Sequence, residues 1–328
     1  MYVNKRAKIL SITPISHIRN VEKELKKIGE LKILNDPSVD QVKKIIHQFD
    51  AIFTNPNKSK VFIGKHVFDR AKKLKVICTA STGTNHIDLK YANKKKIKII
   101  SLKKEKKIIN KISSTSEHAL ALTLASLRNV VSSNRSVLAG KWDYMNFISR
   151  QINFMTIGII GYGRLGKKYA NYCKALGSKI IFYDPYKKQD SKKIKKIDDL
   201  NRLLKLSDII SIHVHLDNET YHKFDKSIFK KLKKDVIIVN TSRGDVINED
   251  HLVGFLKKNK KAKFAADVIE NEIFSKAKNR LLKYAKKNSN QVIVTPHIGG
   301  MTLEAQQIAY SHSVKKLGIF FKKIGRRS

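Results

Sequence analysis

The stretch from Ile157 to Asp184 reads IGIIGYGRLGKKYANYCKALGSKIIFYD, and its pattern predicts a strand, a glycine turn, a helix and a second strand. The apolar run at its start is short enough for a buried parallel strand. The run stops at Gly161–Gly166, which fits the pattern G-x-G-x-x-G. An amphipathic segment follows and ends at Gly177, a residue typical of a helix C-terminus, and Lys179–Tyr183 reads as the second strand.

The three glycines of this turn have separate physical tasks. The first allows a sharp turn, the second, Gly163, lets the backbone approach a pyrophosphate, and the third lets the helix pack on the strand. The helix N-terminus offers unpaired N–H groups and a positive dipole end to the phosphates. Asp184 can accept hydrogen bonds from both ribose hydroxyls and would repel a 2′-phosphate. The stretch therefore predicts NAD, while Lys187 and Lys188 leave NADP open.

The composition is that of a globular protein with a large core. The chain has 328 residues, of which 41% are hydrophobic, and this length predicts two domains. No apolar run reaches the roughly 20 residues that span a bilayer, and the first residues lack the apolar core of a secretory signal. Cys78 and Cys173 both lie in apolar patterns, which suits a reducing compartment. We expect a cytoplasmic protein with no membrane partner, disulfide framework or metal site.

The charge of the chain is unusual. Lysine and arginine number 68 against 27 acidic residues, which gives a formal net charge of +41. Such an excess is typical of nucleic-acid binding. However, the lysines are spread along the whole chain, and no nucleic-acid motif organises them. We interpret them as solvated helix faces, and we expect weak, salt-sensitive binding to nucleic acid without a specific nucleic-acid partner.

Strands and helices alternate along most of the chain, which predicts parallel, doubly wound α/β sheets. After residue 155 the predicted strands are 156–160, 179–183, 208–213, 235–240, 263–268 and 291–295, with helices at 165–176, 198–206, 225–233, 249–258 and 276–287. Before it they are 8–12, 31–34, 51–53, 76–79 and 98–101, with helices at 20–28, 39–48, 65–73 and 87–94. Longer helices are predicted at 115–128 and 302–321.

Polar clusters follow three of the later strands. They are Asn240–Gly244, Asp267–Glu272 and Thr295–Gly300. Ligands of open α/β sheets bind at the carboxyl ends of strands, so we expect these clusters to meet at one edge. Arg243 can hold a carboxylate with two hydrogen bonds, and His297 can exchange a proton near neutral pH. A carboxylate beside such a histidine would orient it and raise its pKa.

The chain resembles the D-isomer-specific 2-hydroxyacid dehydrogenase family over nearly its whole length. The resemblance is carried by Gly161–Gly166 with Asp184, by Ser81–Asp88, by Ser116-Glu-His-Ala119, and by the three polar clusters. It implies a Rossmann NAD-binding domain, 105–295, inserted into a flavodoxin-like substrate domain, 1–104 with 296–328. It also implies an oxidoreductase that transfers a hydride between NAD(H) and a 2-hydroxy or 2-keto acid, the hydroxy acid being the D-isomer.

The resemblance also assigns roles to residues. Arg243 would bind the substrate carboxylate, and His297 paired with Glu272 would be the acid and base. The turn of Thr82, Gly83 and Thr84 would hold the substrate carboxylate through backbone N–H groups. The cofactor would contact Tyr162, Gly163, Arg164, Leu165, Asp184, His213, Thr241, Ser242, Asp267, His297 and Gly299. A homodimer joined through the nucleotide domains and an arm at 113–145 is implied as well.

Some features depart from the family pattern or leave alternatives open. The family commonly has proline after the glutamate, where this chain has Ile273, so Glu270 stays open as the partner of His297, although the spacing from Asp267 favours Glu272. Thr115-Ser116 stands where many relatives have Val-Ala. A metal site at His213 and His215 would need further ligands that the sequence does not offer. The rival hypothesis is an NAD-binding regulatory or scaffold protein of the same fold without turnover.

Overall fold

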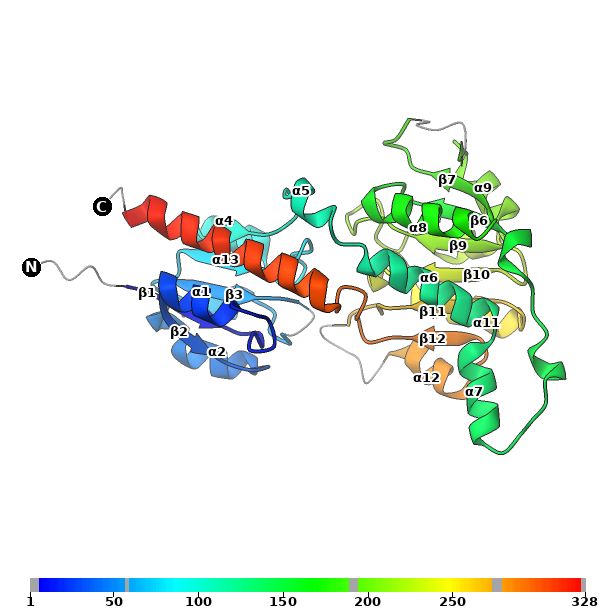
Figure 1. The fold of residues 1–328 in the computed structure, drawn as a ribbon, viewed down its shortest axis with the longest axis horizontal. Helices are drawn as coiled ribbons and strands as arrows, with labels where there is room; N and C mark the ends of the chain where they lie inside the picture. Colours follow the sequence, from blue (N-terminus) through cyan, green and yellow to red (C-terminus); the bar gives the residue numbers. More distant parts are fainter. Residues whose placement is uncertain (1–5, 57–58, 189–193, 273–278, 326–328) are drawn as a thin grey trace, which may run out of the picture. The chain divides into compact units, whose positions relative to one another are not determined.

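The computed structural model describes residues 6–56, 59–188, 194–272 and 279–325. The chain forms two compact units, which we call the first unit (Met1–Ile112 with Met301–Ser328) and the second unit (Ser113–Gly300). Each unit is built on a parallel sheet with helices on both faces (Figure 1). The predicted α/β class with two doubly wound domains is therefore confirmed.

In the first unit, the described strands follow the order β2-β1-β3-β4-β5, which is the arrangement of flavodoxin-like folds. The strands are β1 (Ala7–Ser11), β2 (Gly29–Ile33), β3 (Ala51–Thr54), β4 (Val76–Thr79) and β5 (Lys98–Ile100). The helices are α1 (Val21–Ile28), α2 (Val39–Ile45), α3 (Lys65–Phe68), α4 (Leu89–Lys94), α5 (Lys106–Ile109) and α13 (Leu303–Gly325), with the 3₁₀ helix η1 (Ile46–Gln48).

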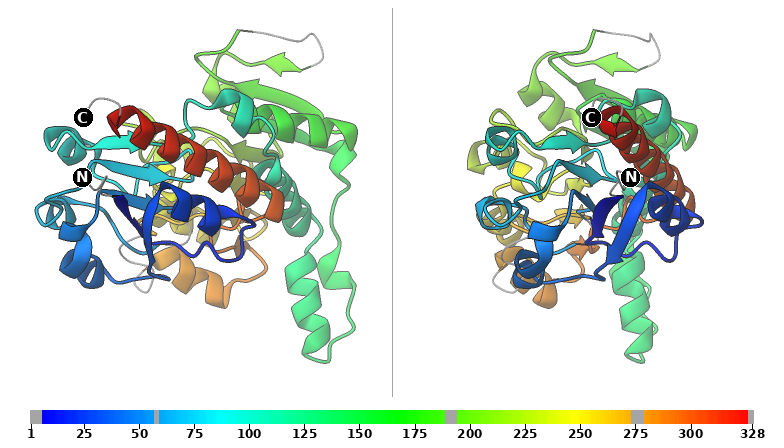
Figure 2. Two further views of the ribbon diagram at one scale, coloured as in Figure 1. Left: turned by 60° about the vertical axis from the view of Figure 1, so that its left-hand side comes forward. Right: turned by 90° about the vertical axis from the view of Figure 1, so that its left-hand side faces the viewer.

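Successive residues of these strands face different helices. On β1, Ile9 packs with α1 and α13, whereas Leu10 packs with the layer formed by α2, α3 and α4. Figure 2 shows α1 and α13 side by side along one face of the sheet, and the two helices are in contact. Both faces of the sheet are thus covered, which explains why its strands read as continuous apolar runs.

In the second unit, the described strands follow the order β12-β11-β10-β9-β6-β7-β8, the arrangement of a Rossmann fold with an extra strand at one edge. The strands are β6 (Thr156–Ile160), β7 (Lys179–Tyr183), β8 (Lys195–Lys196), β9 (Ile209–Ile212), β10 (Ile237–Asn240), β11 (Lys263–Ala266) and β12 (Val292–Val294). The helices are α6 (Ser114–Leu127), α7 (Val130–Leu138), α8 (Arg164–Ala175), α9 (Leu200–Leu206), α10 (Lys226–Phe229), α11 (Glu249–Lys258) and α12 (Arg280–Lys287), with the 3₁₀ helices η2 (Met145–Phe147), η3 (Ile152–Phe154) and η4 (Gly244–Val246).

The second sheet is also covered on both faces. Helices α6 and α8 pack on one face against Ile157 and Ile159 of β6, and α9 to α12 pack on the other face against Ile210 and Ile212 of β9. The strand order reverses between β6 and β9. In such sheets the ligand crevice lies at this switch point, outside the carboxyl ends of the strands. The topology therefore brings the glycine turn and the three polar clusters to one edge.

The boundaries of the units lie at 112 and 300, where the sequence predicted 104 and 295. The segment after residue 104 belongs to the first unit because Glu105 accepts a hydrogen bond of 2.9 Å from His312 on α13. The segment before residue 301 belongs to the second unit because the Gly299 N–H donates to Asp267 at 2.7 Å. Both anchors are tertiary contacts, which a strand-and-helix pattern does not show.

None of the described helices combines the length and apolarity that a membrane crossing needs. Figure 2 also shows α7 projecting from the body of its own unit.

Candidate active site

The glycine turn between β6 and α8 has the geometry that its sequence predicts. Gly161 has φ +90°, a conformation in which other residues are strained. A Cβ on Gly166 would lie 2.2 Å from the Gly161 carbonyl oxygen. Helix α8 can therefore pack against the turn only because residue 166 has no side chain. A Cβ on Gly163 would meet no described atom within 4 Å. The turn thus leaves the backbone at Gly163 open to a ligand, at the N-terminus of a helix.

Asp184 lies at the end of β7 and is buried. Its Oδ2 accepts a hydrogen bond of 2.9 Å from the Tyr162 N–H in the glycine turn, and its Oδ1 accepts one of 2.9 Å from the Tyr186 N–H. Tyr162 is itself buried and stacks on Phe182 of β7. The carboxylate is therefore fixed beside the turn, where a ribose would approach it.

Arg164 and Leu165 begin α8 directly after the turn. Burial lowers the pKa of the Arg164 guanidinium, but arginine stays charged at neutral pH. The backbone oxygen of Leu165 accepts a hydrogen bond of 3.0 Å from the Ser116 hydroxyl on α6. The first turn of α8 is thus tied to a neighbouring helix and carries a cation suited to a phosphate.

His213 follows β9 and lies beside α8. Its Nε2 is 2.8 Å from the Ser211 hydroxyl, and its ring lies 5.2 Å from the ring of Tyr169. Burial lowers the pKa of His213 to about 4, so the imidazole is neutral at physiological pH.

Within the described residues no group of three or more His, Cys, Asp or Glu side chains could hold a metal ion.

The segment after β10 is held by a local network. The Asn240 Oδ1 accepts hydrogen bonds from the Ser242 N–H at 3.0 Å and the Ser242 hydroxyl at 2.7 Å, and its Nδ2 donates to the Arg243 carbonyl at 2.9 Å. A Cβ on Gly244 would lie 2.0 Å or less from the backbone of Ile269, so the segment after β11 packs directly on it. This contact brings Arg243 to the neighbourhood of the acidic cluster.

Arg243 is half-buried, and its Nη1 donates a hydrogen bond of 2.6 Å to the Ser242 carbonyl. Burial lowers the pKa of Arg243, and the charges of Glu272 and Asp245 oppose this shift. The guanidinium therefore stays charged and lies close to the proposed acid–base pair.

Thr241 is buried, and its hydroxyl has no hydrogen-bond partner among the described residues. Buried polar groups in proteins are nearly always hydrogen-bonded, so this hydroxyl can take a hydrogen bond from a bound molecule. Together with the open backbone at Gly163 and the fixed carboxylate of Asp184, it fits a dinucleotide on this edge of the sheet.

His297 and Glu272 lie together, with Nδ1 and Oε1 2.7 Å apart. Their side chains are 23% and 21% exposed. Most of each side chain is therefore buried, and the remaining surface is open to solvent. His297 has φ +57°, a left-handed conformation that costs energy for a residue other than glycine. Ile273, where the family commonly has proline, lies outside the described residues.

Glu270, the other candidate partner of His297, has a different partner. Its Oε1 lies 2.6 Å from Nε2 of His222. Asn271, between the two glutamates, has φ +53°. In the structure, therefore, Glu272 is the glutamate that reaches His297.

Asp267 holds the loop that carries His297. Its two oxygens accept hydrogen bonds from the Thr295 hydroxyl at 2.6 Å, the Ile298 N–H at 2.8 Å and the Gly299 N–H at 2.7 Å. Burial alone would raise the pKa of Asp267, but these bonds and one from His118 outweigh it and lower the pKa. The carboxylate is therefore ionised and fixes the backbone at Ile298 and Gly299.

The predicted substrate turn of Thr82, Gly83 and Thr84 lies in the first unit, after β4. The Ser81 hydroxyl donates to the Gly83 carbonyl at 2.7 Å, and the Ile87 N–H donates to the Thr84 carbonyl at 3.0 Å. The turn is thus held by hydrogen bonds within the first unit.

Three positions were not predicted as part of the site. His118 on α6 lies 2.8 Å from the Thr295 hydroxyl and 3.3 Å from Asp267, and Thr115 donates to the Gly299 carbonyl at 3.2 Å. His222 is the third. His118 belongs to the motif at 116–119 and Thr115 directly precedes it, whereas nothing in the sequence around His222 marks that residue.

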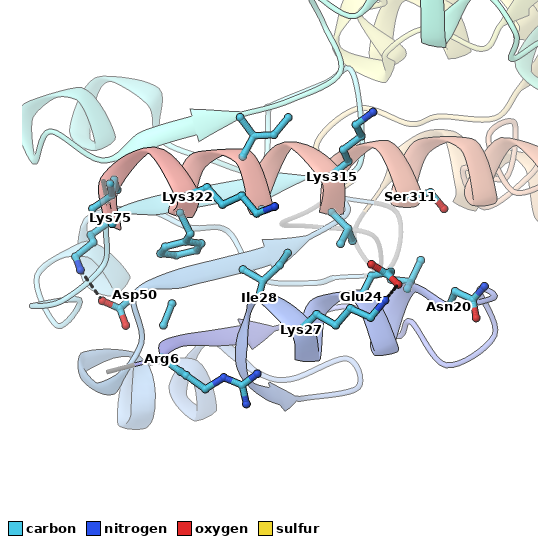
Figure 3. A pocket seen from close by; sticks show the side chains of 18 residues that line it. Arg6, Asn20, Glu24, Lys27, Ile28, Asp50, Lys75, Ser311, Lys315 and Lys322 are labelled. Atoms are coloured by element: carbon cyan, nitrogen blue, oxygen red, sulfur yellow. Dashed lines mark hydrogen bonds and ion pairs between the residues drawn. The ribbon is translucent and has the colours of Figure 1, made fainter. Parts of the chain in front are cut away.

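A large cavity lies elsewhere, between α1 and the second half of α13 in the first unit. Its volume is about 970 Å³ (Figure 3), and none of its lining residues belongs to the predicted site. Its cations are Arg6, Lys27, Lys75, Lys315 and Lys322, and its acids are Glu24 and Asp50. This proportion is that of the whole chain, and Lys27 and Lys75 pair with the two acids, so the charge of the cavity indicates no particular ligand.

Comparison with known proteins agrees with this geometry. The family model of the D-isomer specific 2-hydroxyacid dehydrogenase NAD binding domain matches residues 120–299. D-3-phosphoglycerate dehydrogenase of Archaeoglobus fulgidus is 34% identical over 301 residues, which cover 91% of this chain and 54% of that relative. Hydroxypyruvate reductase of Thermotoga maritima is 32% identical over 287 residues, covering 87% of this chain and 88% of the relative.

A solved structure is similar as well. It is D-lactate dehydrogenase of Aquifex aeolicus complexed with NAD and lactic acid, with a TM-score of 0.82, 27% identity and coverage of 96% of each chain. The chain spans about half the length of the phosphoglycerate dehydrogenase relatives that it matches. The family match confirms the predicted family and the predicted NAD-binding domain: this chain belongs to the D-isomer specific 2-hydroxyacid dehydrogenase family.

Proposed function

We propose that this protein is an NAD-dependent oxidoreductase that interconverts a D-2-hydroxy acid and the corresponding 2-keto acid. The observation that carries the proposal is the pair of His297 and Glu272, 2.7 Å apart, with Arg243 in their electrostatic neighbourhood. An imidazole, a carboxylate and a guanidinium are the groups that proton transfer at a carboxylate-bearing substrate requires.

The second unit would hold the dinucleotide along the carboxyl edge of its sheet. The backbone at Gly163 and the first turn of α8 would face the pyrophosphate, Asp184 would bind the ribose, and Thr241 would use its buried hydroxyl. Bound there, NAD(H) supplies or accepts the hydride. Asp267 would keep the backbone at Gly299 in place beside the cofactor.

The acid–base step belongs to His297. In the reduction direction, its imidazolium would donate a proton to the substrate oxygen as that oxygen gains negative charge, and in oxidation the neutral ring would remove the hydroxyl proton. Glu272 would orient the ring through its contact with Nδ1. Arg243 would bind the carboxylate and stabilise negative charge on the adjacent oxygen, an effect often worth a few kcal/mol.

The relatives support the substrate class. The substrates in their names are 3-phosphoglycerate, hydroxypyruvate and lactate, each of which is a 2-hydroxy or a 2-keto acid. The D-isomer is supported by the family and by two of these names.

The proposal is tested with purified protein, NADH and a panel of 2-keto acids that includes simple, phosphorylated and sugar-derived ones. We expect NADH oxidation with at least one of them and D-configuration in the product. Arg243→Ala should raise KM and lower kcat for that acid while the dissociation constant of NADH stays within about twofold. Tight NADH binding without turnover on any acid would contradict the proposal and favour a regulatory protein.

We also propose that the protein forms a homodimer through the arm of residues 130–154. Large apolar side chains are exposed along this arm: Val130, Val137, Leu138, Trp142, Tyr144, Met145, Ile148 and Phe154. Trp142 is 88% exposed, which is unusual for this residue type. So many exposed apolar side chains in one segment are typical of an interface, and a second copy of the chain would cover them.

A further inference from the structure

The first turn of α6 contacts two parts of the proposed cofactor site that lie far apart in the sequence. Helix α6 packs against α8 and against β10, β11 and β12 (Figure 1). Within its first turn, Ser116 contacts the start of α8, whereas Thr115 and His118 contact the loop after β12. The proposed chemistry assigns no task to these three side chains.

Ser116 is buried, and its hydroxyl donates a hydrogen bond of 3.0 Å to the Leu165 carbonyl. Leu165 is the second residue of α8 and follows directly on the glycine turn that would face the pyrophosphate. A carbonyl oxygen has two lone pairs, so it can accept this bond in addition to a bond within the helix. The Ser116 hydroxyl therefore ties the phosphate-binding end of α8 to α6.

The Thr115 hydroxyl donates a hydrogen bond of 3.2 Å to the Gly299 carbonyl, two residues after His297. The two segments are also packed together, because a Cβ on Gly299 would lie 3.4 Å from Cγ2 of Thr115. His118 is on the same face of α6 as Thr115, and its Nε2 lies 2.8 Å from the Thr295 hydroxyl. This face of the turn therefore holds the loop of His297 on both sides.

In the proposed function, the loop that carries His297 lies beside the nicotinamide. The imidazole exchanges a proton with the oxygen of the substrate carbonyl, and the nicotinamide exchanges a hydride with the carbon of the same group. Both reacting groups must therefore be in contact with that carbonyl at once. Thr115 thus acts at the nicotinamide end of the dinucleotide, and Ser116 acts at its pyrophosphate.

We propose that Thr115 and Ser116 form a clamp of two hydroxyls that fixes the pyrophosphate-binding and nicotinamide-binding parts of the site relative to each other. Both are positioning residues, because Ser116 acts through the backbone of Leu165 and Thr115 through that of Gly299. The inference rests on the proposed function for the position of the dinucleotide, and its test needs no turnover. Many relatives have Val-Ala at these two positions, so the clamp distinguishes this chain from them.

The clamp is tested by the binding of NADH and of ADP-ribose, which has the pyrophosphate and both riboses but no nicotinamide. Ser116→Ala releases the start of α8, so the dissociation constants of both ligands should rise about fivefold, the ratio that corresponds to one hydrogen bond. Thr115→Val keeps the methyl contact with Gly299 and loses only the hydrogen bond. The dissociation constant of NADH should then rise about fivefold, while that of ADP-ribose stays within about twofold.

Ser178→Ala is the matched control. Ser178 is also buried in the second unit, and its hydroxyl donates a hydrogen bond of 2.9 Å to the Ile152 carbonyl. It directly precedes β7 and therefore lies at the amino end of the sheet, away from the ligand crevice. We expect a loss of stability in this variant, with both dissociation constants within about twofold of the wild-type values.

Calorimetric titration of the full chain measures both ligands, and thermal unfolding shows that each variant is folded at the temperature of the titration. The clamp is overturned if Ser116→Ala binds both ligands like the wild-type protein, or if Thr115→Val weakens both equally. Gly163→Ala separates this failure from that of the proposed site. If it weakens NADH binding while the variants at 115 and 116 do not, the clamp is wrong and the position of the dinucleotide stands. If it binds NADH like the wild-type protein, that position is wrong and the clamp with it.

Discussion

His297 is held in a left-handed backbone conformation that costs about 1–3 kcal/mol for a residue other than glycine. The cost is met by the neighbouring backbone, where Ile298 and Gly299 both donate to the buried carboxylate of Asp267. The imidazole is therefore placed by the loop as a whole, and its direction does not depend on Glu272 alone.

Removing this imidazole should abolish most turnover. In His297→Ala we expect kcat for keto-acid reduction to fall at least about 100-fold, because proton transfer by a positioned group contributes this much. NADH binding, measured by fluorescence, should stay within about twofold. His66→Ala, which removes an exposed histidine of the first unit, is the control. An unchanged kcat in His297→Ala would remove the residue from the mechanism.

Glu249 makes the stability of the protein depend on pH. Burial raises its pKa to about 7, although hydrogen bonds from the Glu270 N–H and the Asn279 side chain oppose the shift. The folded state therefore binds this proton more tightly than the unfolded chain does. The resulting stabilisation is complete below about pH 4 and is lost as the pH rises through 7.

The corresponding test is urea unfolding of the wild-type protein and of Glu249→Gln from pH 5 to pH 8. We expect the wild-type free energy of unfolding to decline relative to the variant by about 2–3 kcal/mol over this range. Glu304→Gln, at an exposed carboxylate of α13, should follow the wild-type curve. Parallel curves for Glu249→Gln and the wild-type protein would show that the Glu249 proton does not contribute.

The sequence predicted the residue types of the site and the pairing of His297 with Glu272, which lie 2.7 Å apart. Arg243, His297 and the acidic cluster follow strands, and the carboxyl ends of parallel strands share one edge. The spacing from Asp267 favoured Glu272 over Glu270, and in the structure Glu270 contacts His222 instead. His222 was missed because its partner is 48 residues away and both lie in irregular segments.

At the scale of elements, most strands were predicted to within one or two residues. Buried parallel strands are short apolar runs, and β6, β7 and β4 match their predicted ranges. Prediction from hydrophobic periodicity failed where an element is too short to show a period. Neither the two lysines of β8 nor the single turn of α5 has a periodicity, and α10 is shorter than the predicted 225–233. Part of the predicted helix 276–287 lies outside the described residues.

The glycine turn offers a matched pair of substitutions. In Gly166→Ala the new Cβ would lie 2.2 Å from the Gly161 carbonyl, so we expect a clear loss of stability of about 1–3 kcal/mol. In Gly163→Ala the Cβ meets no described atom within 4 Å and φ is −82°, so stability should change by less than about 1 kcal/mol.

Gly163→Ala should instead weaken NADH binding about tenfold, because the methyl group occupies the approach of the pyrophosphate. Thermal unfolding and NADH fluorescence titration separate the two effects. Gly254→Ala, on α11 and also without a described atom near the added Cβ, controls for the substitution itself. Unchanged NADH affinity in Gly163→Ala would contradict the proposed place of the dinucleotide.

At the scale of the whole molecule, the proposed dimer can be tested through its exposed arm. Light scattering should give twice the chain mass of 37.5 kDa for the wild-type protein. The double variant Leu138→Glu with Ile148→Glu places charges in the proposed interface and should give the monomer mass. Leu206→Glu, at an exposed leucine that ends α9, should remain dimeric. A monomeric wild-type protein at micromolar concentration would refute the proposed dimer.

The net charge of +41 leads to a prediction about nucleic acid. The lysines are distributed over both units, so we expect DNA binding without sequence preference. Between 50 and 200 mM salt the affinity should fall by at least about 100-fold, because binding by dispersed cations releases counterions. Fluorescence anisotropy with two unrelated duplexes measures both properties. Tight, sequence-dependent binding at physiological salt would show a dedicated nucleic-acid site.

The placement of α13 has a consequence for the order of events during synthesis. One face of the first sheet, with Ile9 and Phe53 among its residues, is covered in part by Tyr310, Val314 and Leu317 of this last helix. The ribosome makes α13 on the order of 200 residues after β5, which takes about 10–40 s at 5–20 residues per second. The second unit is therefore fully synthesised before α13, which covers this face of the first sheet, has been made. During that interval this apolar face of the first sheet is exposed in the nascent chain. It is then a binding surface for a holding chaperone.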